Sequence, residues 1–247
     1  MSVIVADSFA VTAGRSGSGK SLTCRANLGI LSGGIGVTAG SIDFDGIELT
    51  DLGRKHWRPL RGTGISAVFQ DPASYLNPSI RVGEHLAEAL RSTLGLSRAN
   101  ARRRGVELFR KMGLNDADTV YRQYPHELSG GMLQRVLIAI AVSAEPELLI
   151  ADEATTVLDV TVQAEVLDLL EDLRDELGLA LVLVSHDLAV VAQVCDSVIV
   201  MRDGAVVGSG RAGDLLTAPR HEYTRQLVEN HRDYGLESVI GKEAARV

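Results

Sequence analysis

The segment Gly14-Arg15-Ser16-Gly17-Ser18-Gly19-Lys20-Ser21 constrains the fold of this chain more than any other. An apolar run at residues 9–13 precedes it, and a helical pattern follows it. Glycines allow successive backbone N–H groups to point at one anion, and the following helix directs its positive end at the same anion. The segment therefore predicts a strand, a phosphate-binding loop and a helix, in that order. This setting disfavours the alternative of a merely flexible loop.

Further apolar runs rich in β-branched residues alternate with helical patterns, which is typical of a parallel sheet covered by helices. The predicted strands are residues 9–13, 65–69, 148–151, 181–185 and 197–202. Between the second and third of these strands, helical patterns at residues 82–94 and 99–111 dominate. We therefore predict an α/β core formed by residues 1–71 and 146–247, with a helical subdomain inserted at residues 72–145.

Near the end of the chain, the pair Asp203-Gly204 separates two short apolar runs and predicts a tight β-hairpin. A final helix is expected at residues 223–229. The basic cluster at residues 102–104 lies on a predicted helix, where a solvated helix face is the simplest interpretation.

Composition excludes several classes of function. The net charge is −7, with acidic and basic residues mixed along the chain, so no broad basic surface for nucleic acid is expected. Cys24 and Cys195 lie far apart without the spacing of a disulfide framework or a metal site, which indicates a reducing compartment. No stretch approaches the roughly 18 apolar residues of a membrane span, and the first residues do not resemble a secretion signal. We expect a soluble protein inside the cell.

Two acidic residues complete a predicted nucleotide site with the glycine-rich loop. Lys20 supplies a mobile cation for the β and γ phosphates, and the Ser21 hydroxyl can ligate Mg²⁺. Asp152 and Glu153 end an apolar strand, where Asp152 is placed to hold Mg²⁺ and Glu153 to polarise an attacking water. A helix N-terminus also favours acidic residues, but the phosphate loop makes the catalytic interpretation the stronger one.

Polar residues also follow two other predicted strands, Gln70 after residues 65–69 and His186 after residues 181–185. A single Gln or His at the end of a strand is usually an ordinary loop residue. Ligands of open parallel sheets bind beyond the carboxyl ends of the strands, so we expect both side chains to converge on the γ-phosphate. Gln70 is then a further Mg²⁺ ligand, and both residues assist catalysis.

Ser129, Gly130 and Gly131 precede a long apolar helical run at residues 136–144. Ser129 can cap this helix, which is one interpretation. The glycines and their N–H groups can also form a second anion site. Physical reasoning alone leaves both alternatives open.

Taken in order, these motifs resemble the nucleotide-binding subunits of ABC transporters. The residues that carry the resemblance are the glycine-rich loop, Gln70, the LSGGMLQR segment from Leu128, the LLIADE segment ending at Glu153, the TTVLD segment ending at Asp159, and His186. The resemblance implies the fold of a P-loop NTPase of the RecA-like type. It also implies an ATPase that uses ATP and Mg²⁺ on the inner face of a membrane, as a peripheral subunit.

The resemblance further implies a head-to-tail pair of cassettes, with ATP held between the loop of one and the LSGG segment of the other. Ser129, Gly130 and Gly131 then contact the γ-phosphate held by the partner, and Asp159 lies at the dimer seam. Gln70 links the nucleotide to two permease subunits, which work with a substrate-binding protein. No nucleic acid partner is implied.

Within this family, the segments around Thr23, Pro125 and His221 resemble the importers of peptides and nickel. Leu133 within the LSGG segment, and the absence of a cysteine-containing extension after Tyr234, favour nickel or a related metal. The alternative is a dipeptide or oligopeptide importer. None of the six histidines has metal-site spacing, which is expected of a subunit that never contacts the cargo.

Three departures from the family pattern bear on activity. Only 13 residues precede Gly14, so two strands and an aromatic residue that stacks on adenine are missing from the expected antiparallel β part. Stacking contributes roughly 1–3 kcal/mol per base, which predicts ATP affinity lowered about five- to a hundredfold. Ala154 stands where the family usually has a proline, and Arg15 stands where peptide importers often have a glutamate. We expect both departures to have modest effects. A truncated cassette that is catalytically impaired and acts only as a structural partner is the rival interpretation.

Overall fold

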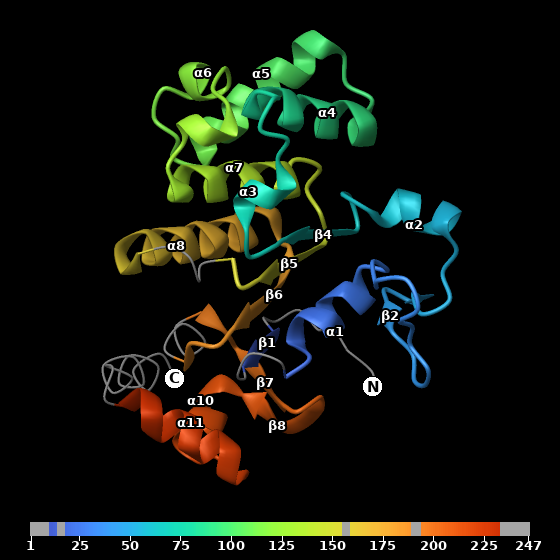
Figure 1. The fold of residues 1–247 in the computed structure, drawn as a ribbon, viewed down its shortest axis with the longest axis vertical. Coiled ribbons are helices and arrows are strands. Elements are labelled where there is room, and N and C mark those ends of the chain that lie inside the picture. Colours follow the sequence, from blue (N-terminus) through green and yellow to red (C-terminus); the bar gives the residue numbers. More distant parts are fainter. Residues whose placement is uncertain (1–9, 14–17, 155–158, 189–193, 233–247) are drawn as a thin grey trace. The chain divides into compact units, whose positions relative to one another are not determined.

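The computed structural model describes residues 10–13, 18–154, 159–188 and 194–232 of the 247-residue chain. The chain divides into two compact units. Unit 1 comprises Met1–Trp57, Ile150–Glu153 and Ala180–Val247, and unit 2 comprises Arg58–Leu149 and Ala154–Leu179. Figure 1 shows the elements of both units.

A mostly parallel sheet forms the centre of unit 1. Its strands, in spatial order, are β5 (Leu148–Asp152), β6 (Ala180–Ser185), β1 (Ala10–Ala13), β7 (Ser197–Arg202) and β8 (Ala205–Arg211). The middle strand, β1, pairs in parallel with both neighbours, so that Ala13 lies opposite Ser185 of β6 and Val200 of β7. Strand β8 runs antiparallel to β7. The carboxyl ends of the parallel strands therefore meet at one edge of the sheet.

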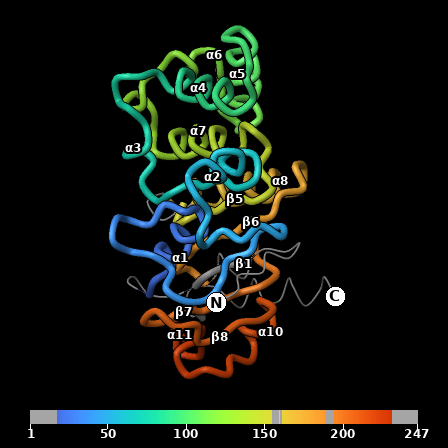
Figure 2. Tube along the Cα trace, turned by 90° about the vertical axis from the view of Figure 1, so that its right-hand side faces the viewer, coloured from blue at the N-terminus to red at the C-terminus, as the bar shows by residue number. Residues whose placement is uncertain are grey.

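Helix α1 (Lys20–Asn27) follows β1 in unit 1, and β2 (Asp43–Phe44) and β3 (Ile47–Glu48) form a separate antiparallel pair. Helices α10 (Ala212–Thr217) and α11 (Glu222–Arg232) pack on β8, as the two views in Figures 1 and 2 agree. The guanidinium of Arg202 lies 4.8 Å from the ring centre of Tyr223, which helps to fix α11.

Unit 2 is largely helical. Its elements are α3 (Pro72–Tyr75), α4 (Val82–Leu94), α5 (Arg98–Lys111), α6 (Ala117–Val120), the short 3₁₀ helix Pro125–Glu127, α7 (Gly130–Val142), α8 (Val160–Leu177) and the strand β4 (Ile65–Val68). Helix α2 (Arg54–Leu60) spans the boundary between the two units in the sequence. The core of unit 2 contains fully buried side chains, among them Leu86, Leu90, Phe109 and Ile138. The Leu148 N–H donates to the Gly64 carbonyl at 2.9 Å, which joins the start of β5 to the segment before β4.

The α/β fold with a mostly parallel sheet is confirmed, and so are the predicted strands, most of which deviate by one residue at an end. Helix α4 has the predicted limits, and α5 begins one residue earlier than predicted. Asp203 and Gly204 both have positive φ, 48° and 80°, as a type I′ hairpin turn requires. All of the predicted helical insert lies within unit 2, together with β4 and α8.

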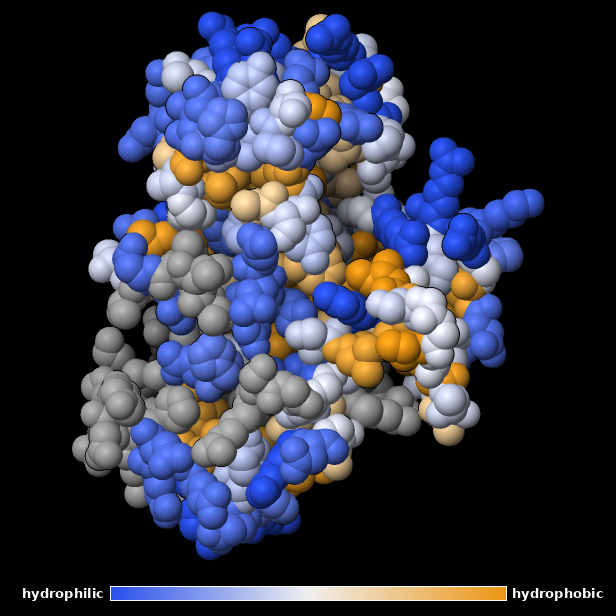
Figure 3. Space-filling view, in the orientation of Figure 1, coloured by the Kyte–Doolittle hydropathy of each residue, from blue (hydrophilic) through white to orange (hydrophobic). Residues whose placement is uncertain are grey.

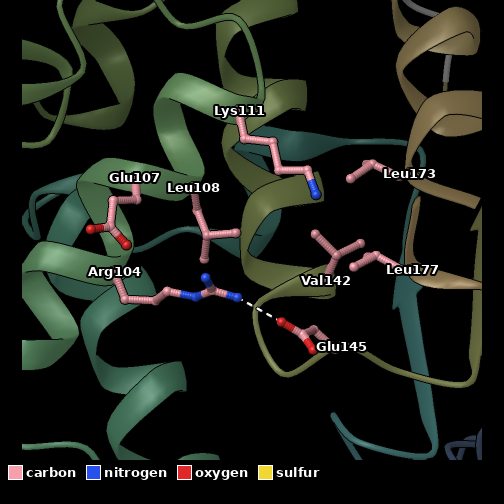
Figure 4. A pocket seen from close by; sticks show the side chains of 8 residues that line it. All are labelled: Arg104, Glu107, Leu108, Lys111, Val142, Glu145, Leu173 and Leu177. Carbon is pink, nitrogen blue, oxygen red and sulfur yellow. Dashed lines mark hydrogen bonds and ion pairs between the residues drawn. The ribbon is translucent and has the colours of Figure 1, made fainter.

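The basic cluster contributes to packing in unit 2. Arg104 forms an ion pair with Glu145 at 2.6 Å, and Arg102 lies 5.6 Å from the ring centre of Tyr121. Figure 4 shows the Arg104 pair at the edge of a cavity of about 140 Å³, which has aliphatic side chains such as Leu108 and Leu173 in its wall. None of the predicted site residues lines this cavity.

Both cysteines are buried, and neither forms a disulfide within the described part of the chain. In the part of the chain that the structure describes, no group of His, Cys, Asp and Glu side chains has the arrangement of a metal cluster. Among the described helices, none has the length and apolar character needed to cross a membrane.

Candidate functional site

The end of the glycine-rich loop and the start of α1 form a buried cationic site in unit 1. Gly19 has φ +94°, a left-handed conformation that glycine adopts without strain, and α1 begins at the next residue. The Lys20 side chain is only 4% exposed, and its ammonium donates to the Ser18 hydroxyl at 3.3 Å. Residues 14–17, and with them the predicted ligands Gly14, Arg15, Ser16 and Gly17, lie outside the described residues.

Asp152 stands at the carboxyl end of β5 and contacts α1. The Ser21 hydroxyl donates to Asp152 Oδ1 at 3.1 Å, although the two residues are 131 positions apart in the chain. Burial raises the pKa of the Asp152 carboxyl, and the nearby Glu153 adds to this effect. The Ser21 hydrogen bond and the cations Arg25 and Lys20 oppose it. An ionised Asp152 is therefore held at an energetic cost that a bound cation would relieve.

Glu153, the next residue, has a strained backbone. Its φ is +49°, in the left-handed region that costs a residue with a side chain roughly 1–3 kcal/mol. Its N–H donates to the Val184 carbonyl of β6 at 3.0 Å, which holds this conformation against the neighbouring strand.

The charge of Lys20 interacts with both of these carboxylates. Burial lowers the pKa of the Lys20 ammonium, whereas Glu153 and then Asp152 raise it. Lys20 and Asp152 are buried and Glu153 is partly buried, so their charges interact more strongly than they would in bulk water.

His186 follows β6 directly, two residues after the carbonyl that receives the Glu153 N–H. Its side chain is exposed. The next turn is fixed by the Asp187 N–H, which donates to Ser185 Oγ at 3.0 Å. The parallel register places Ala13 opposite Ser185, so the glycine-rich loop and His186 follow adjacent strands at the same edge of the sheet. The structure thus brings together Lys20, Ser21, Asp152, Glu153 and His186 in unit 1.

The remaining predicted residues lie in unit 2. Gln70 is exposed, two positions beyond the end of β4. Ser129 caps α7, because its hydroxyl accepts the Met132 N–H at 3.3 Å, which confirms the predicted cap. Asp159 caps α8 in the same way, since its Oδ1 accepts the Val162 N–H at 3.0 Å. Their proposed approach to the nucleotide stays a prediction.

The start of α7 is exposed at Ser129 and Gly130 but closely packed at Gly131. A Cβ atom added to Gly131 would lie 2.6 Å from Cγ1 of Val162 on α8. The glycine is therefore required for the two helices to approach, independently of any role in anion binding.

Sequence reasoning overlooked one supporting contact of the loop. The Gly204 N–H, in the β7–β8 turn, donates to the Ser18 carbonyl at 3.2 Å, and a Cβ on Gly19 would lie 3.7 Å from the Gly204 Cα. The Asp203-Gly204 pair signalled the turn, but the sequence carries no signal that this turn reaches the loop 186 residues earlier in the chain.

The groups in unit 1 fit a phosphate chain accompanied by a hard divalent cation. The Ser21 hydroxyl and the Asp152 carboxylate supply oxygen ligands within 3.1 Å of each other, the ligand type that Mg²⁺ prefers. Lys20 supplies a buried cation, and the first turn of α1 supplies backbone N–H groups for an anion.

A family model described as ABC transporter matches residues 4–156, which is more than half of the chain. The chain is 44% identical over 216 residues to the oligopeptide transport ATP-binding protein AppD of Bacillus subtilis, covering 87% of this chain and 66% of that protein. It is 43% identical over 215 residues to the dipeptide transport ATP-binding protein DppD of Escherichia coli, again covering 87% and 66%. It is also 41% identical to the DppD protein of Lactococcus lactis, of which it covers 62%. The chain thus spans less than two thirds of the length of these relatives.

Among solved structures, the ATP-binding cassette MJ0796 as a dimer bound to ADP and Pi superposes with a TM-score of 0.73 at 28% identity, covering 83% of this chain and 86% of that chain. A second dimeric structure of the same bacterial ABC transporter cassette gives 0.72 at 29% identity. The chain belongs to the ABC transporter family, with the P-loop NTPase fold of its cassettes.

Proposed function

We propose that this chain binds Mg-ATP and hydrolyses it as the cassette subunit of a peptide importer. The observation that carries the proposal is the cluster in unit 1, in which the charge of Lys20 interacts with Asp152 and Glu153 and Ser21 donates to Asp152 at 3.1 Å. An ammonium, two carboxylates and a hydroxyl group thus come together at the end of β5.

Each residue of the cluster has a distinct part in the proposed reaction. Lys20 binds the β and γ phosphates, together with the loop residues Ser18 and Gly19. Ser21 and Asp152 hold Mg²⁺, which neutralises charge on the phosphates as the bond to the leaving group breaks. Glu153 orients a water molecule toward the γ-phosphate and accepts its proton.

His186 directly follows β6, the strand whose Val184 carbonyl accepts the Glu153 N–H, and it is proposed to position the same water or the γ-phosphate. Gln70 is proposed to complete the metal ligands and to report the nucleotide state to the permeases. These two assignments rest on the family resemblance and on the strand ends that the residues follow.

The proposed partner is a second cassette. Ser129 and Gly130 are exposed at the N-terminus of α7, so their polar groups are accessible to a nucleotide held by another subunit. Asp159 is exposed at the start of α8 and would lie at the same seam. The MJ0796 cassette forms a dimer bound to ADP and Pi, which supports this arrangement.

The proposed cargo is a dipeptide or oligopeptide. AppD and both DppD relatives are named for oligopeptide or dipeptide transport. They favour the peptide alternative over the nickel prediction, which had rested on Leu133 and the composition of the C-terminal segment. Two permease subunits and a substrate-binding protein complete the proposed transporter, and this chain works peripherally on the cytoplasmic side of the inner membrane.

Phosphate release from Mg-ATP tests the proposed enzyme. The purified chain, with its partner cassette where one is required, is expected to release phosphate, and Glu153→Gln to lose at least a hundredfold in rate, consistent with the loss of a general base. Glu147→Gln is the matched control, because Glu147 is an exposed carboxylate just before the same strand. Equal rates for the wild type and Glu153→Gln would refute the proposal. Absence of hydrolysis in the assembled transporter would favour the impaired structural partner instead.

A further inference from the structure

Arg135 on α7 forms hydrogen bonds to two other helices of unit 2 at once. Its Nη1 donates to the carbonyl of Met112, which caps the end of α5, at 2.8 Å, and its Nη2 donates to Glu165 Oε2 on α8, also at 2.8 Å. The Arg135 side chain is only 17% exposed, so its charge is largely removed from water and depends on these two bonds. The planar guanidinium donates in two fixed directions, which a lysine ammonium on a flexible stem does less well. We call Arg135, Met112 and Glu165 the Arg135 clasp.

The bond to Met112 shapes the end of α5. The last carbonyls of a helix lack partners within the helix and form the negative end of its dipole, so a cation is favourable there. Gly113, the next residue, has φ +71°, and a Cβ atom added to it would lie 3.0 Å from Arg135 Nη1. The left-handed backbone and the close approach of the guanidinium therefore both favour glycine at this position.

The bond to Glu165 fixes α8 against α7. Gly131 packs against Val162 near the start of both helices, and Arg135 meets Glu165 one helical turn later in each of them. The two helices therefore run parallel with their N-termini together, and Figure 1 shows them next to one another. Parallel helices place the like ends of their dipoles side by side, which is unfavourable, and the ion pair offsets part of this cost.

Two exposed capping residues stand at these neighbouring N-termini. The Ser129 hydroxyl accepts the Met132 N–H at the start of α7, and Asp159 Oδ1 accepts the Val162 N–H at the start of α8. Each cap is bound to the first turn of its own helix, so the register between α7 and α8 sets the position of one cap relative to the other. These are the two residues that the proposed function assigns to the seam with a second cassette.

We propose that Arg135 is a positioning residue for the ATP-dependent pairing of two cassettes, because it joins α7 to α8 and to α5 and so holds Ser129 and Asp159 as one preformed surface. The inference rests on the proposed function, which brings these caps to a nucleotide held by the partner. Arg135 acts through the caps, since it lies almost two helical turns beyond Ser129. A preformed surface loses less conformational entropy on binding. Loss of the clasp therefore weakens the pairing of cassettes, whereas unit 1 keeps its affinity for its own nucleotide.

Hydrogen exchange of the nucleotide-free 247-residue chain tests the clasp without any dependence on ATP. Arg135→Ala and Glu165→Ala are each expected to speed the exchange of the amides of residues 132–133 and 162–163, which bond to the two caps, at least fivefold. Glu165→Gln retains an acceptor oxygen for the guanidinium and should recover most of the protection. Glu165 is 57% exposed, so its variants keep the test decisive if Arg135→Ala fails to fold. Unchanged exchange in the clasp variants would overturn the proposal.

Arg110→Ala is the matched control, because it breaks an ion pair of the same length in the same unit. Arg110 lies 2.8 Å from Asp118 and is 61% exposed. It belongs to α5, in a region whose surface is largely hydrophilic in Figure 3. Exposed pairs of this kind contribute little, so exchange at the starts of α7 and α8 should stay as in the wild type. Equal acceleration by Arg110→Ala and Arg135→Ala would overturn the proposal, since it would reflect general destabilisation of unit 2.

ATP-dependent association tests the positioning role. In a Glu153→Gln background, with the partner cassette where one is required, sedentation velocity is replaced by equilibrium sedimentation to give the dissociation constant of the ATP-bound pair. Arg135→Ala should raise this constant at least tenfold, whereas the affinity of the single chain for Mg-ATP should stay within twofold. Adding Glu165→Ala should weaken the pair little further, because both changes break one contact.

Three outcomes would overturn the positioning role. The first is normal association of Arg135→Ala despite faster exchange at the helix starts, and the second is an equal loss of Mg-ATP affinity in the single chain. The third is a chain with intact Arg135 that binds no Mg-ATP, which would refute the proposed function too. Exchange in the nucleotide-free chain distinguishes this third case, since the clasp would still protect the same amides.

Discussion

At the scale of single residues, the candidate site is organised at the expense of stability. Asp152 is 5% exposed and Lys20 is 4% exposed, and burial shifts the pKa of each toward its neutral form. Ions in such positions weaken the empty protein and are stabilised when counter-charges arrive. The left-handed Glu153 adds backbone strain at the same point. Binding of a negatively charged ligand with its metal is expected to relieve these costs.

Replacement of Asp152 by asparagine tests this interpretation. The pKa of Asp152 is raised in the folded state. Ionisation of this carboxyl therefore lowers the stability of the folded protein at pH values above the ordinary pKa of 3.8, and it has no effect on stability at pH values well below 3.8. Asp152→Asn should therefore be more stable than the wild type near pH 7 without nucleotide, and the difference should shrink as the pH falls toward 3.8. Urea unfolding at several pH values measures it.

Exposed Asp168 on α8 provides the control for this experiment, because Asp168→Asn changes the same charge away from the site. The Asp152 variant should also lose Mg²⁺-dependent ATP hydrolysis. A destabilised Asp152→Asn protein would contradict the account, since it would mean that the ionised carboxylate stabilises the empty site.

Gln134 is the second residue whose behaviour can be predicted. It is fully buried in α7, and neither its Nε2 nor its Oε1 has a hydrogen-bond partner among the described residues. Replacing an unsatisfied buried amide by an apolar side chain of similar size removes a desolvation cost of ~1–3 kcal/mol. Gln134→Leu should accordingly raise the free energy of unfolding, whereas replacing the exposed Gln226 of α11 by leucine should change it little. A loss of stability in Gln134→Leu would indicate that the amide has a partner in solution.

At the scale of elements, the start of α7 depends on its contact with α8. Gly131→Ala would place a methyl group 2.6 Å from Val162, which must force the helices apart because real contacts are not this close. We expect a loss of stability of about 1–3 kcal/mol and a lower rate of ATP hydrolysis, measured by unfolding and by phosphate release.

A second substitution distinguishes packing from anion binding at this position. Val162→Ala removes the methyl group that the added Cβ would meet, so the double variant should recover both stability and activity. Recovery of stability without activity would assign Gly131 a direct role at the nucleotide in addition to its role in packing.

Elements of strong periodicity could be predicted from the sequence, whereas others could not. Helix α4 and the turn at Asp203 and Gly204 follow from local pattern, because amphipathic spacing and turn chemistry are local properties. Strands β2 and β3 contain only two residues each, which is too few to show a periodic pattern of apolar residues. Helix α8 follows directly from an Asp159 cap, a signal that was interpreted only as part of a family motif.

The candidate site shows the same division. The glycine-rich loop, Asp152 and Glu153 could be found because each ends or follows a strand in the sequence. The Ser21–Asp152 bond and the support of Ser18 by Gly204 join residues more than 130 positions apart, so only the folded chain reveals them. The strain at Glu153 is likewise a property of the neighbouring strand and has no local signal.

At the scale of the whole molecule, nucleotide binding should appear as thermal stabilisation. A ligand present at a hundred times its dissociation constant stabilises the folded state by about 2.7 kcal/mol. Mg-ATP should raise the melting temperature of the wild type, and Lys20→Ala should abolish this shift because it removes the buried cation. Replacing the exposed Lys55 by alanine should leave the shift unchanged. Equal shifts in the wild type and Lys20→Ala would place the nucleotide elsewhere.

The central claim is that Glu153 acts on bound ATP and does not serve mainly to hold the nucleotide or the fold. Separating the bound nucleotide from the protein after one turnover, with its partner cassette present where required, tests this most directly. The wild type should yield ADP, and Glu153→Gln should yield intact ATP in comparable amount. ADP recovered equally from both proteins, or a variant that binds no ATP at all, would contradict the claim.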